Sequence, residues 1–384
     1  MSRLLCALGF FAITATITLI TNAAPYVPKT ADEIVAQWPA LNDTTLQKIT
    51  SPLQDNQSNT QAGDTTAIVA VANAYLAQAA LPGQSRLYGL AQAVLKPAIE
   101  KSVKENKPID KNLWLVWAQV QQHQHNFVVA QQALEKVLQQ DPTNINANLL
   151  AARIYVIQEN PLAARNACLK LLGSADLFTV TACSLEANTY LNPGDLGSSY
   201  QQLKQLIHSQ GLPRDERGTW LIQMLADMAL RNKDPSAAAS WLEQRLKNAS
   251  VNYLSQWADV QLELNNAAQV IQHLTQVLNN APEMDDALLL RLALAEKKIN
   301  APERLWQSQL TERILLREQR QDNLHANEMT VYYLDINPNP VKALYWARIN
   351  IVSAKEAHDK ELLARAETLN HTEAPSFNKD HRDE

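Results

Sequence analysis

The chain has 384 residues, long enough for two ordinary domains or for one extended repeat array. Only 9 glycines and 5 phenylalanines occur, a composition that disfavours β-sheets and favours helices. The formal net charge of -5, without a dense basic patch, gives no support to nucleic-acid binding.

The N-terminus has the pattern of a secretory signal, MSRLLCALGFFAITATITLITNAAP. Arg3 precedes an apolar run over residues 4–20, and small residues follow at Ala23 and Ala24. We expect cleavage of residues 1–23 and an exported, periplasmic chain without a membrane span. The alternatives are a secreted protein and an uncleaved anchor, because the run is nearly long enough to cross a bilayer.

Residues 24–66 are expected to form a short N-terminal helix and a polar linker. Thr30-Ala-Asp-Glu33 resembles a capping box, and SPLQDNQSNTQAG follows it as the linker. Residues 67–100 then predict a divergent first helical pair, with Ala72, Tyr75 and Ala91 at small and aromatic positions.

The next stretch, WAQVQQHQHNFVVAQQALEKVLQQDPTN, predicts two helices and a stop. Its second half carries one apolar stripe at helical spacing, and Asp141-Pro142 ends it because proline disfavours a helical residue before it. A shift of 140 residues along the sequence places Trp117-Ala118 on Trp257-Ala258 and Pro142 on Pro282. This shift corresponds to four units of about 35 residues, close to the tetratricopeptide period of about 34 residues.

Intermediate units fill the space between these two copies. They read INANLLAARIYVIQENPLAARNACLKLL, SLEANTYLNPGDLGSSYQQLKQLI and WLIQMLADMALRNKDPSAAASWLEQRL. In each, small Ala residues allow close helix approach beside a larger Trp, Tyr or Leu, and one unit cannot bury its apolar face alone. Residues 101–284 therefore predict stacked repeats, and the fold class is all-α, a right-handed α-solenoid of tetratricopeptide-like helix-turn-helix units.

Beyond the regular block, residues 285–367 keep the helical periodicity with less clean register and predict degenerate repeats and a cap. Residues 368–384 are polar and charged and predict a disordered tail.

Four stretches together resemble a family of exported bacterial tetratricopeptide repeat proteins with no established activity. They are SRLYGLAQAVLKP, QHNFVVAQQALEKVLQQDPTNINANLLAARIYVIQ, ARNACLKL with TACSLEA, and ALYWARINIVSAKEAHDKELLARA, so the similarity spans roughly residues 28–367. The family often has Trp after the Asn of the last motif, where this chain has Ile351 after Asn350. The resemblance implies an envelope location and a repeat scaffold, without catalytic residues.

Cys168 and Cys183 are the two cysteines that remain after signal cleavage. They lie on neighbouring predicted helices, equally far from the turn near Ala175 and Asp176, so facing Cα atoms could approach to the ~4.4–6.8 Å of a disulfide. An oxidising compartment permits the bond, and two buried thiols are the alternative.

No catalytic or cofactor motif is found, and we expect neither an enzyme nor a cofactor. His123 and His125 are two residues apart, do not share a helix face and have no third ligand near them in sequence. His371 and His381 lie in the expected tail, so we expect no metal site.

The first helix of each unit lines the concave side of such a solenoid. Side-chain amides both donate and accept hydrogen bonds, so a row of them could hold an extended peptide. We therefore expect a scaffold that binds a protein or peptide of the cell envelope in this groove. The alternatives are an assembly subunit of a membrane complex that uses its outer face, and an accessory factor for metal or polysaccharide handling. The predicted groove residues are Asn112, Leu115, Gln119, Asn146, Leu149, Arg153, Asn188, Gln223, Asp227, Asn252 and Asp259.

Overall fold

The computed structural model describes residues 65–373, and these form helices and turns without a strand. All of them belong to one compact unit, Gln47–Glu384. Three expected segments lie outside the described residues: the signal over 1–23, nearly all of the helix and linker over 24–66, and the tail beyond Glu373. Within the described part, no helix has both the length and the apolar character needed to cross a membrane.

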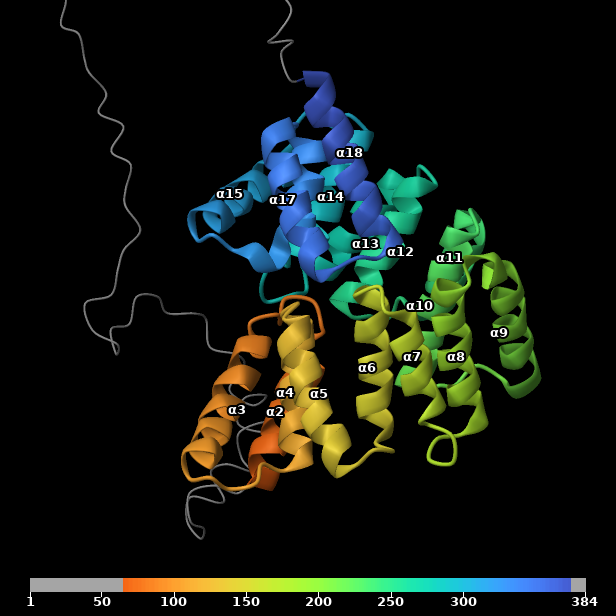
Figure 1. Cartoon of the computed structure of the whole chain (residues 1–384). Coiled ribbons are helices and arrows are strands. Elements are labelled where there is room, and N and C mark those ends of the chain that lie inside the picture. The colour runs from red at the N-terminus through yellow and green to blue at the C-terminus, as the bar shows by residue number, and fades with distance from the viewer. Residues whose placement is uncertain (1–64, 374–384) are drawn as a thin grey trace, which may run out of the picture. The chain divides into compact units, whose positions relative to one another are not determined.

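Helices pack in consecutive pairs (Figure 1). The predicted all-α solenoid is confirmed. The pairs are α2 (Thr65–Ala79) with α3 (Leu87–Lys104), α4 (Lys111–His123) with α5 (Phe127–Gln140), α6 (Ile145–Ile157) with α7 (Pro161–Leu169), α8 (Leu177–Leu191) with α9 (Leu196–Gln210), α10 (Glu216–Arg231) with α11 (Pro235–Leu242), α12 (Val251–Glu263) with α13 (Ala267–Leu278), α14 (Asp286–Lys298) with α15 (Leu305–Gln319), and α17 (Pro340–Ser353) with α18 (Ala357–Glu373). Between the last two pairs, α16 (Ala326–Val331) continues into a π-helical turn, Tyr332–Ile336.

A recurring turn closes several of the pairs. One residue takes a positive φ, and the backbone N–H of the next residue bonds to the carbonyl five positions earlier, which satisfies the end of the first helix. The following side chain then caps the second helix in α7 and α11, where Asn160 and Asp234 accept from backbone N–H groups. The positive-φ residues of this turn are His125, Glu159, Lys233 and Asn265.

The small residues that the repeat predicts are buried between helices. Ala118, Ala152, Ala187, Ala226 and Ala258 lie on first helices and are at most 5% exposed. Their partners on second helices, such as Ala130, Ala164 and Ala238, are fully buried. Close approach at these positions lets each pair bury a face that it could not cover alone.

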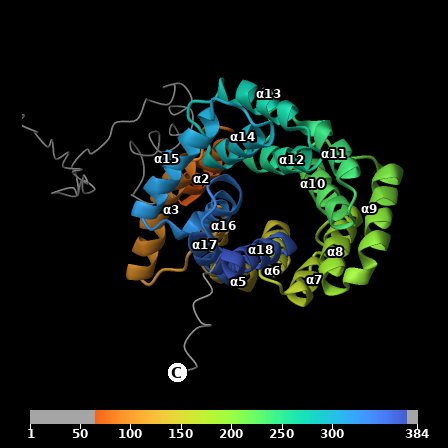
Figure 2. The ribbon, with the colours of Figure 1, turned by 90° about the horizontal axis from the view of Figure 1, so that it is seen from above.

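The array curves until its C-terminal half meets its N-terminal half. Viewed from above, α8, α10 and α12 form an inner layer, and α9, α11 and α13 form an outer one (Figure 2). The backbone N–H of Val251 donates to the carbonyl of Ala80 at 2.9 Å, and that of Lys355 donates to Ile157 at 2.8 Å. The turns within the first pairs therefore lie against the C-terminal half, and we call this side the closed edge (residues 80–86, 124–126 and 158–160).

The loops that join one pair to the next lie at the opposite ends of the same helices (Figure 1). We call this side the free edge (residues 105–110, 141–144, 170–176 and 211–215). Among the described residues, the loops over 105–110, 141–144 and 170–176 have no hydrogen bond or ion pair to a residue beyond Arg217, whereas Arg245 donates to the carbonyls of Pro213 and Asp215 in the loop over 211–215.

The observed boundaries differ from the expected ones at two places. The tail is expected from residue 368, but α18 continues through Glu373, and the hydroxyls of Thr368 and Thr372 donate to carbonyls one turn earlier. The first pair extends over 65–104, beyond the expected 67–100, since Lys101 and Lys104 continue the last turn of α3.

Candidate functional site

The inner helices carry all of the predicted groove residues, on α4, α6, α8, α10 and α12. One prediction has to be corrected, that of Leu115 as a groove residue. Its side chain is 9% exposed and packs in the core with Phe127 and Ala151, so it offers no surface to a partner. The period places Leu115 on the first helix, but core residues of α5 and α6 cover its side chain there.

An ion-paired cluster lies where α6, α8 and the loop before α18 meet. The guanidinium of Arg153 is 3.0 Å from the carboxylate of Glu356 and 3.8 Å from that of Glu186. Burial opposes the charge on Arg153, yet these two carboxylates raise its pKa. The sequence had offered Arg153 as the one cation of the groove, and in the structure this charge is already engaged.

Glu186 is the less well satisfied member of this cluster. Its side chain is 14% exposed, and burial raises the pKa of its carboxyl to about 7, with further contributions from Asp227 and Glu356. Arg153 acts in the opposite direction but is held more closely by Glu356. Glu186 is therefore a carboxyl that exchanges a proton near neutral pH.

A second cluster joins α8 to α10. Arg231 donates through Nε to Asp227 at 2.9 Å and through Nη2 to the hydroxyl of Thr189 at 2.6 Å. Its guanidinium carbon lies 4.1 Å from the centroid of the Tyr190 ring, and the Tyr190 hydroxyl is 3.3 Å from Asp227. Asp227, a predicted groove residue, is thus held by its neighbours.

Other predicted polar residues are also paired within the fold. Asp259 receives two hydrogen bonds from Arg291, at 2.9 and 2.8 Å. Gln223 donates to Gln256 at 3.2 Å, and Asn188 donates to Asp195 at 3.1 Å. Asp227 with Arg231 has the i,i+4 spacing that sequence can reveal, whereas Glu356, Glu186 and Arg291 had no local sequence signal.

Four predicted amides remain available. Among residues 65–373, no hydrogen-bond partner is found for the side chains of Asn112, Gln119, Asn146 or Asn252. The three asparagines are each the second residue of an inner helix, α4, α6 or α12, and all three are exposed. Leu149, half-buried, packs against the core between them. The inner surface therefore combines free amides near the helix starts with paired charges further along.

The histidines do not form a metal centre in the described part of the chain. His123 stacks on Tyr88 with ring centroids 4.5 Å apart, and desolvation lowers its pKa. His125 instead approaches His325, at 6.5 Å between ring centroids, where the closed edge meets α16. No group of three or more His, Cys, Asp or Glu suited to a metal ion occurs among the described residues.

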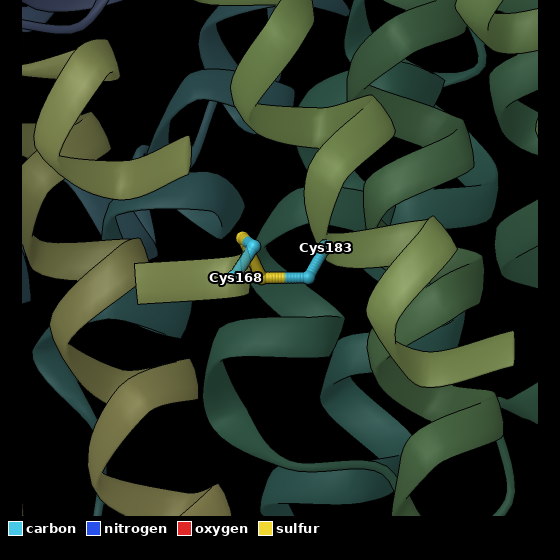
Figure 3. The surroundings of a disulfide bond; sticks show 2 residues. All are labelled: Cys168 and Cys183. Carbon is cyan, nitrogen blue, oxygen red and sulfur yellow. A yellow bond between two sulfur atoms is a disulfide. The ribbon is translucent and has the colours of Figure 1, made fainter. Parts of the chain in front are cut away.

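Cys168 and Cys183 form a disulfide between α7 and α8 (Figure 3). Their Cα atoms are 5.6 Å apart, and both side chains are buried. Of the two alternatives that the sequence left open, the structure has the bonded one. The bond fixes the start of the loop over residues 170–176, which belongs to the free edge.

Comparisons with known proteins give structural similarity alone. No family model and no curated protein matches the sequence. Among solved structures, the chain is similar to a tetratricopeptide repeat protein from Parabacteroides merdae ATCC 43184, with 14% identity, a TM-score of 0.44, and coverage of 66% of this chain and 99% of that one. It is also similar to pilF of Pseudomonas aeruginosa, with 16% identity, a TM-score of 0.36, and coverage of 55% of this chain and 95% of that one. A chain of the APC/C hetero-tetramer Cut9-Hcn1 has 13% identity and a TM-score of 0.31, with coverage of 79% of this chain and 63% of that one.

Proposed function

We propose that this protein is an interaction scaffold that binds a protein or peptide of the cell envelope along its inner surface, without catalysis. The observation that carries the proposal is the set of unpaired amides on inner helices, Asn112 and Gln119 on α4, Asn146 on α6 and Asn252 on α12. Each amide offers a donor and an acceptor, so those on the consecutive inner helices α4 and α6 suit the N–H and C=O groups of an extended backbone.

The charged residues of the inner surface already have ion-pair partners, and a ligand would have to break these pairs to bind to them. Arg153, Asp227 and Asp259 have carboxylate or guanidinium partners already, and a ligand group would have to replace these partners to bind there. Replacing a charge pair breaks an existing bond within the fold, whereas an exposed amide exchanges only its hydrogen bonds to water, with a net gain of about 0.5–1.5 kcal/mol for each new bond. We therefore expect a partner to bind through the exposed amides and not through the paired charges.

A matched pair of triple variants tests this proposal in intact cells of the source. Asn112→Ala with Asn146→Ala and Asn252→Ala removes the three free asparagines without touching an ion pair. The control, Gln132→Ala with Asn166→Ala and Gln202→Ala, removes three exposed amides from the outer helices α5, α7 and α9. Each protein is crosslinked and its co-purifying chains are compared with those of the wild type.

We expect a partner that is captured by the wild type and by the outer-helix control, and lost from the inner-helix variant. Equal loss from both variants would show that the amides matter in general and not through the inner surface. Capture by all three proteins would refute binding through these asparagines and would favour the outer face, the site that the membrane-complex alternative requires.

A further inference from the structure

A small pocket lies where the end of α15 meets the start of α17, and we call it the α17 pocket. Its lining residues are Glu318, Gln321, Lys342, Tyr345 and Trp346, and its volume is about 290 Å³. Sites that enclose a cofactor or a drug-sized ligand typically measure about 300–1,000 Å³. The α17 pocket therefore suits a short piece of a peptide better than an enclosed cofactor.

The charged groups of the α17 pocket are paired with each other. Glu318 accepts from the ammonium of Lys342 at 2.9 Å and from the hydroxyl of Tyr333 at 2.7 Å. The two bonds use different carboxylate oxygens, and Lys342 also donates to Tyr333 at 3.1 Å. One positive and one negative charge at this distance leave the lining residues without a net charge, so they do not select an ionic ligand.

Two aromatic side chains of α17 supply the binding groups of the pocket. Tyr345, at 57%, is the one exposed Phe, Tyr or Trp among residues 65–373. Trp346 is 4% exposed, and its ring centroid lies 5.0 Å from that of Tyr345. Within the described residues, the indole N–H of Trp346 has no hydrogen-bond partner, and it is not among the polar atoms that the core encloses. Gln321 is exposed, and its side-chain amide is also unbonded to other residues of this range.

These free groups favour one kind of backbone. An indole N–H can only donate, so a ligand must supply an acceptor to it. The interior carbonyls of a helix cannot serve, because they bond within the helix, whereas a polyproline II segment leaves its carbonyls free. Proline also has no N–H that would be left unpaired against an aromatic ring, and exposed aromatic rings pack well on proline rings.

We propose that the α17 pocket binds a proline-rich peptide segment in the polyproline II conformation. A proline ring packs on Tyr345, the carbonyl before it accepts from the indole N–H of Trp346, and Gln321 donates to a neighbouring carbonyl. The paired Glu318 and Lys342 form the polar wall. The pocket residues lie at the end of α15 and on α17, apart from the amides of α4, α6 and α12, so this inference does not depend on the proposed function.

The test is fluorine NMR on the full chain labelled with 5-fluorotryptophan. The chain has 8 tryptophans, and the resonance that disappears in Trp346→Phe is assigned to Trp346. The resonance of Trp257, which is fully buried in the core, is assigned in the same way and is the internal control. The probe is decaproline, and a Gly-Ser peptide of equal length is the control probe.

We expect decaproline to shift the Trp346 resonance and to leave that of Trp257 unchanged, and the Gly-Ser peptide to shift neither. Tyr345→Ala should weaken the affinity for decaproline about tenfold, because the ring that packs on proline is lost. Val352→Ala is the matched control, since it shortens a side chain that is 77% exposed on the same helix but outside the pocket. An unshifted Trp346 resonance, or equal affinities of Tyr345→Ala and Val352→Ala, would overturn the proposal.

A saccharide is the other class of ligand that packs on an exposed aromatic ring, but its hydroxyls donate as well as accept. The same titration with a chito-oligosaccharide separates the two classes. We expect no shift of the Trp346 resonance with the saccharide. A shift with the saccharide and none with decaproline would refute the peptide site and identify a saccharide site in its place.

Discussion

Arg153 and Glu356 are 203 residues apart in the chain, yet their charged groups lie 3.0 Å from each other. The contact is part of a clasp in which the loop between α17 and α18 closes on the end of α6. Lys355 donates its backbone N–H to Ile157, Lys360 pairs with Glu159, and Ala354 packs on the core formed by α4–α8. These bonds therefore hold the last helical pair of the array against the end of α6.

The clasp predicts a local effect for Glu356→Gln. This change removes the closer partner of Arg153 and leaves Glu186 at 3.8 Å. Since Arg153 is 42% exposed, we expect a loss of only about 1 kcal/mol in the free energy of unfolding. Hydrogen exchange should rise in α18 and at the end of α6, and stay unchanged in α10–α13. Faster exchange throughout the array would show instead that the bond supports the whole fold.

Glu186→Gln is predicted to change how stability depends on pH. The folded carboxyl has its pKa raised to about 7, above its unfolded pKa of about 4.3. Its contribution to stability is therefore complete below the unfolded value and is lost as the pH rises through about 7. Around it lie Arg153, Glu356, Asp227 and Arg231, all of which the variant keeps.

Urea unfolding at pH 5 and pH 8 measures this effect. The wild type should lose up to about 3 kcal/mol more than Glu186→Gln between these two pH values. The difference between the two proteins isolates this carboxyl, because other titrating groups, such as His123, are common to both. Parallel pH profiles would mean that Glu186 is ionised in the fold at neutral pH.

The repeat itself could be predicted from the sequence because its determinants are local. Small residues at Ala118 and Ala258, the break at Pro142 and the capping side chains each act within one pair or between neighbours. The clasp could not be predicted in this way. The curvature that brings Glu356 to Arg153 is the sum of small rotations between many pairs, and no residue near either position encodes that sum.

The inner-surface residues could also be predicted only in part from local sequence. Periodicity identifies which helix carries Leu115 but not how far the neighbouring helices cover it. Asn112, Leu115 and Gln119 share one face of α4 by their spacing of three and four residues, yet of the three only Leu115 is buried. Periodicity also treated Arg153, Asp227 and Asp259 as available side chains. Arg231 lies on the same helix as Asp227, but Glu356 comes from the α17–α18 loop and Arg291 from α14, so these two pairings depend on how the helices stack.

Loss of the disulfide is predicted to destabilise the array measurably. The bond closes a loop of 15 residues, for which restriction of the unfolded chain corresponds to about 3 kcal/mol. Chemical unfolding of the wild type with and without reductant should show a difference of this order. Cys168→Ala with Cys183→Ala should be equally destabilised and insensitive to reductant. A reductant effect that persists in the double variant would place its origin outside this bond.

Gly83→Ala is predicted to weaken the contact between the α2–α3 turn and the segment before α14 at the closed edge. Gly83 has a φ of +74°, and its N–H donates to Asp285; a Cβ there would lie 2.8 Å from the carbonyl oxygen of Glu283 and from the ring of Pro282. Both the backbone conformation and the crowding oppose the change, so we expect a loss of about 1–3 kcal/mol. Gly89→Ala, on α3 with nothing within 4 Å of its Cβ, is the matched control and should be neutral or stabilising. Hydrogen exchange should rise in the α2–α3 turn and at the start of α14 in Gly83→Ala alone, and equal stability of the two variants would contradict a tight contact at this position.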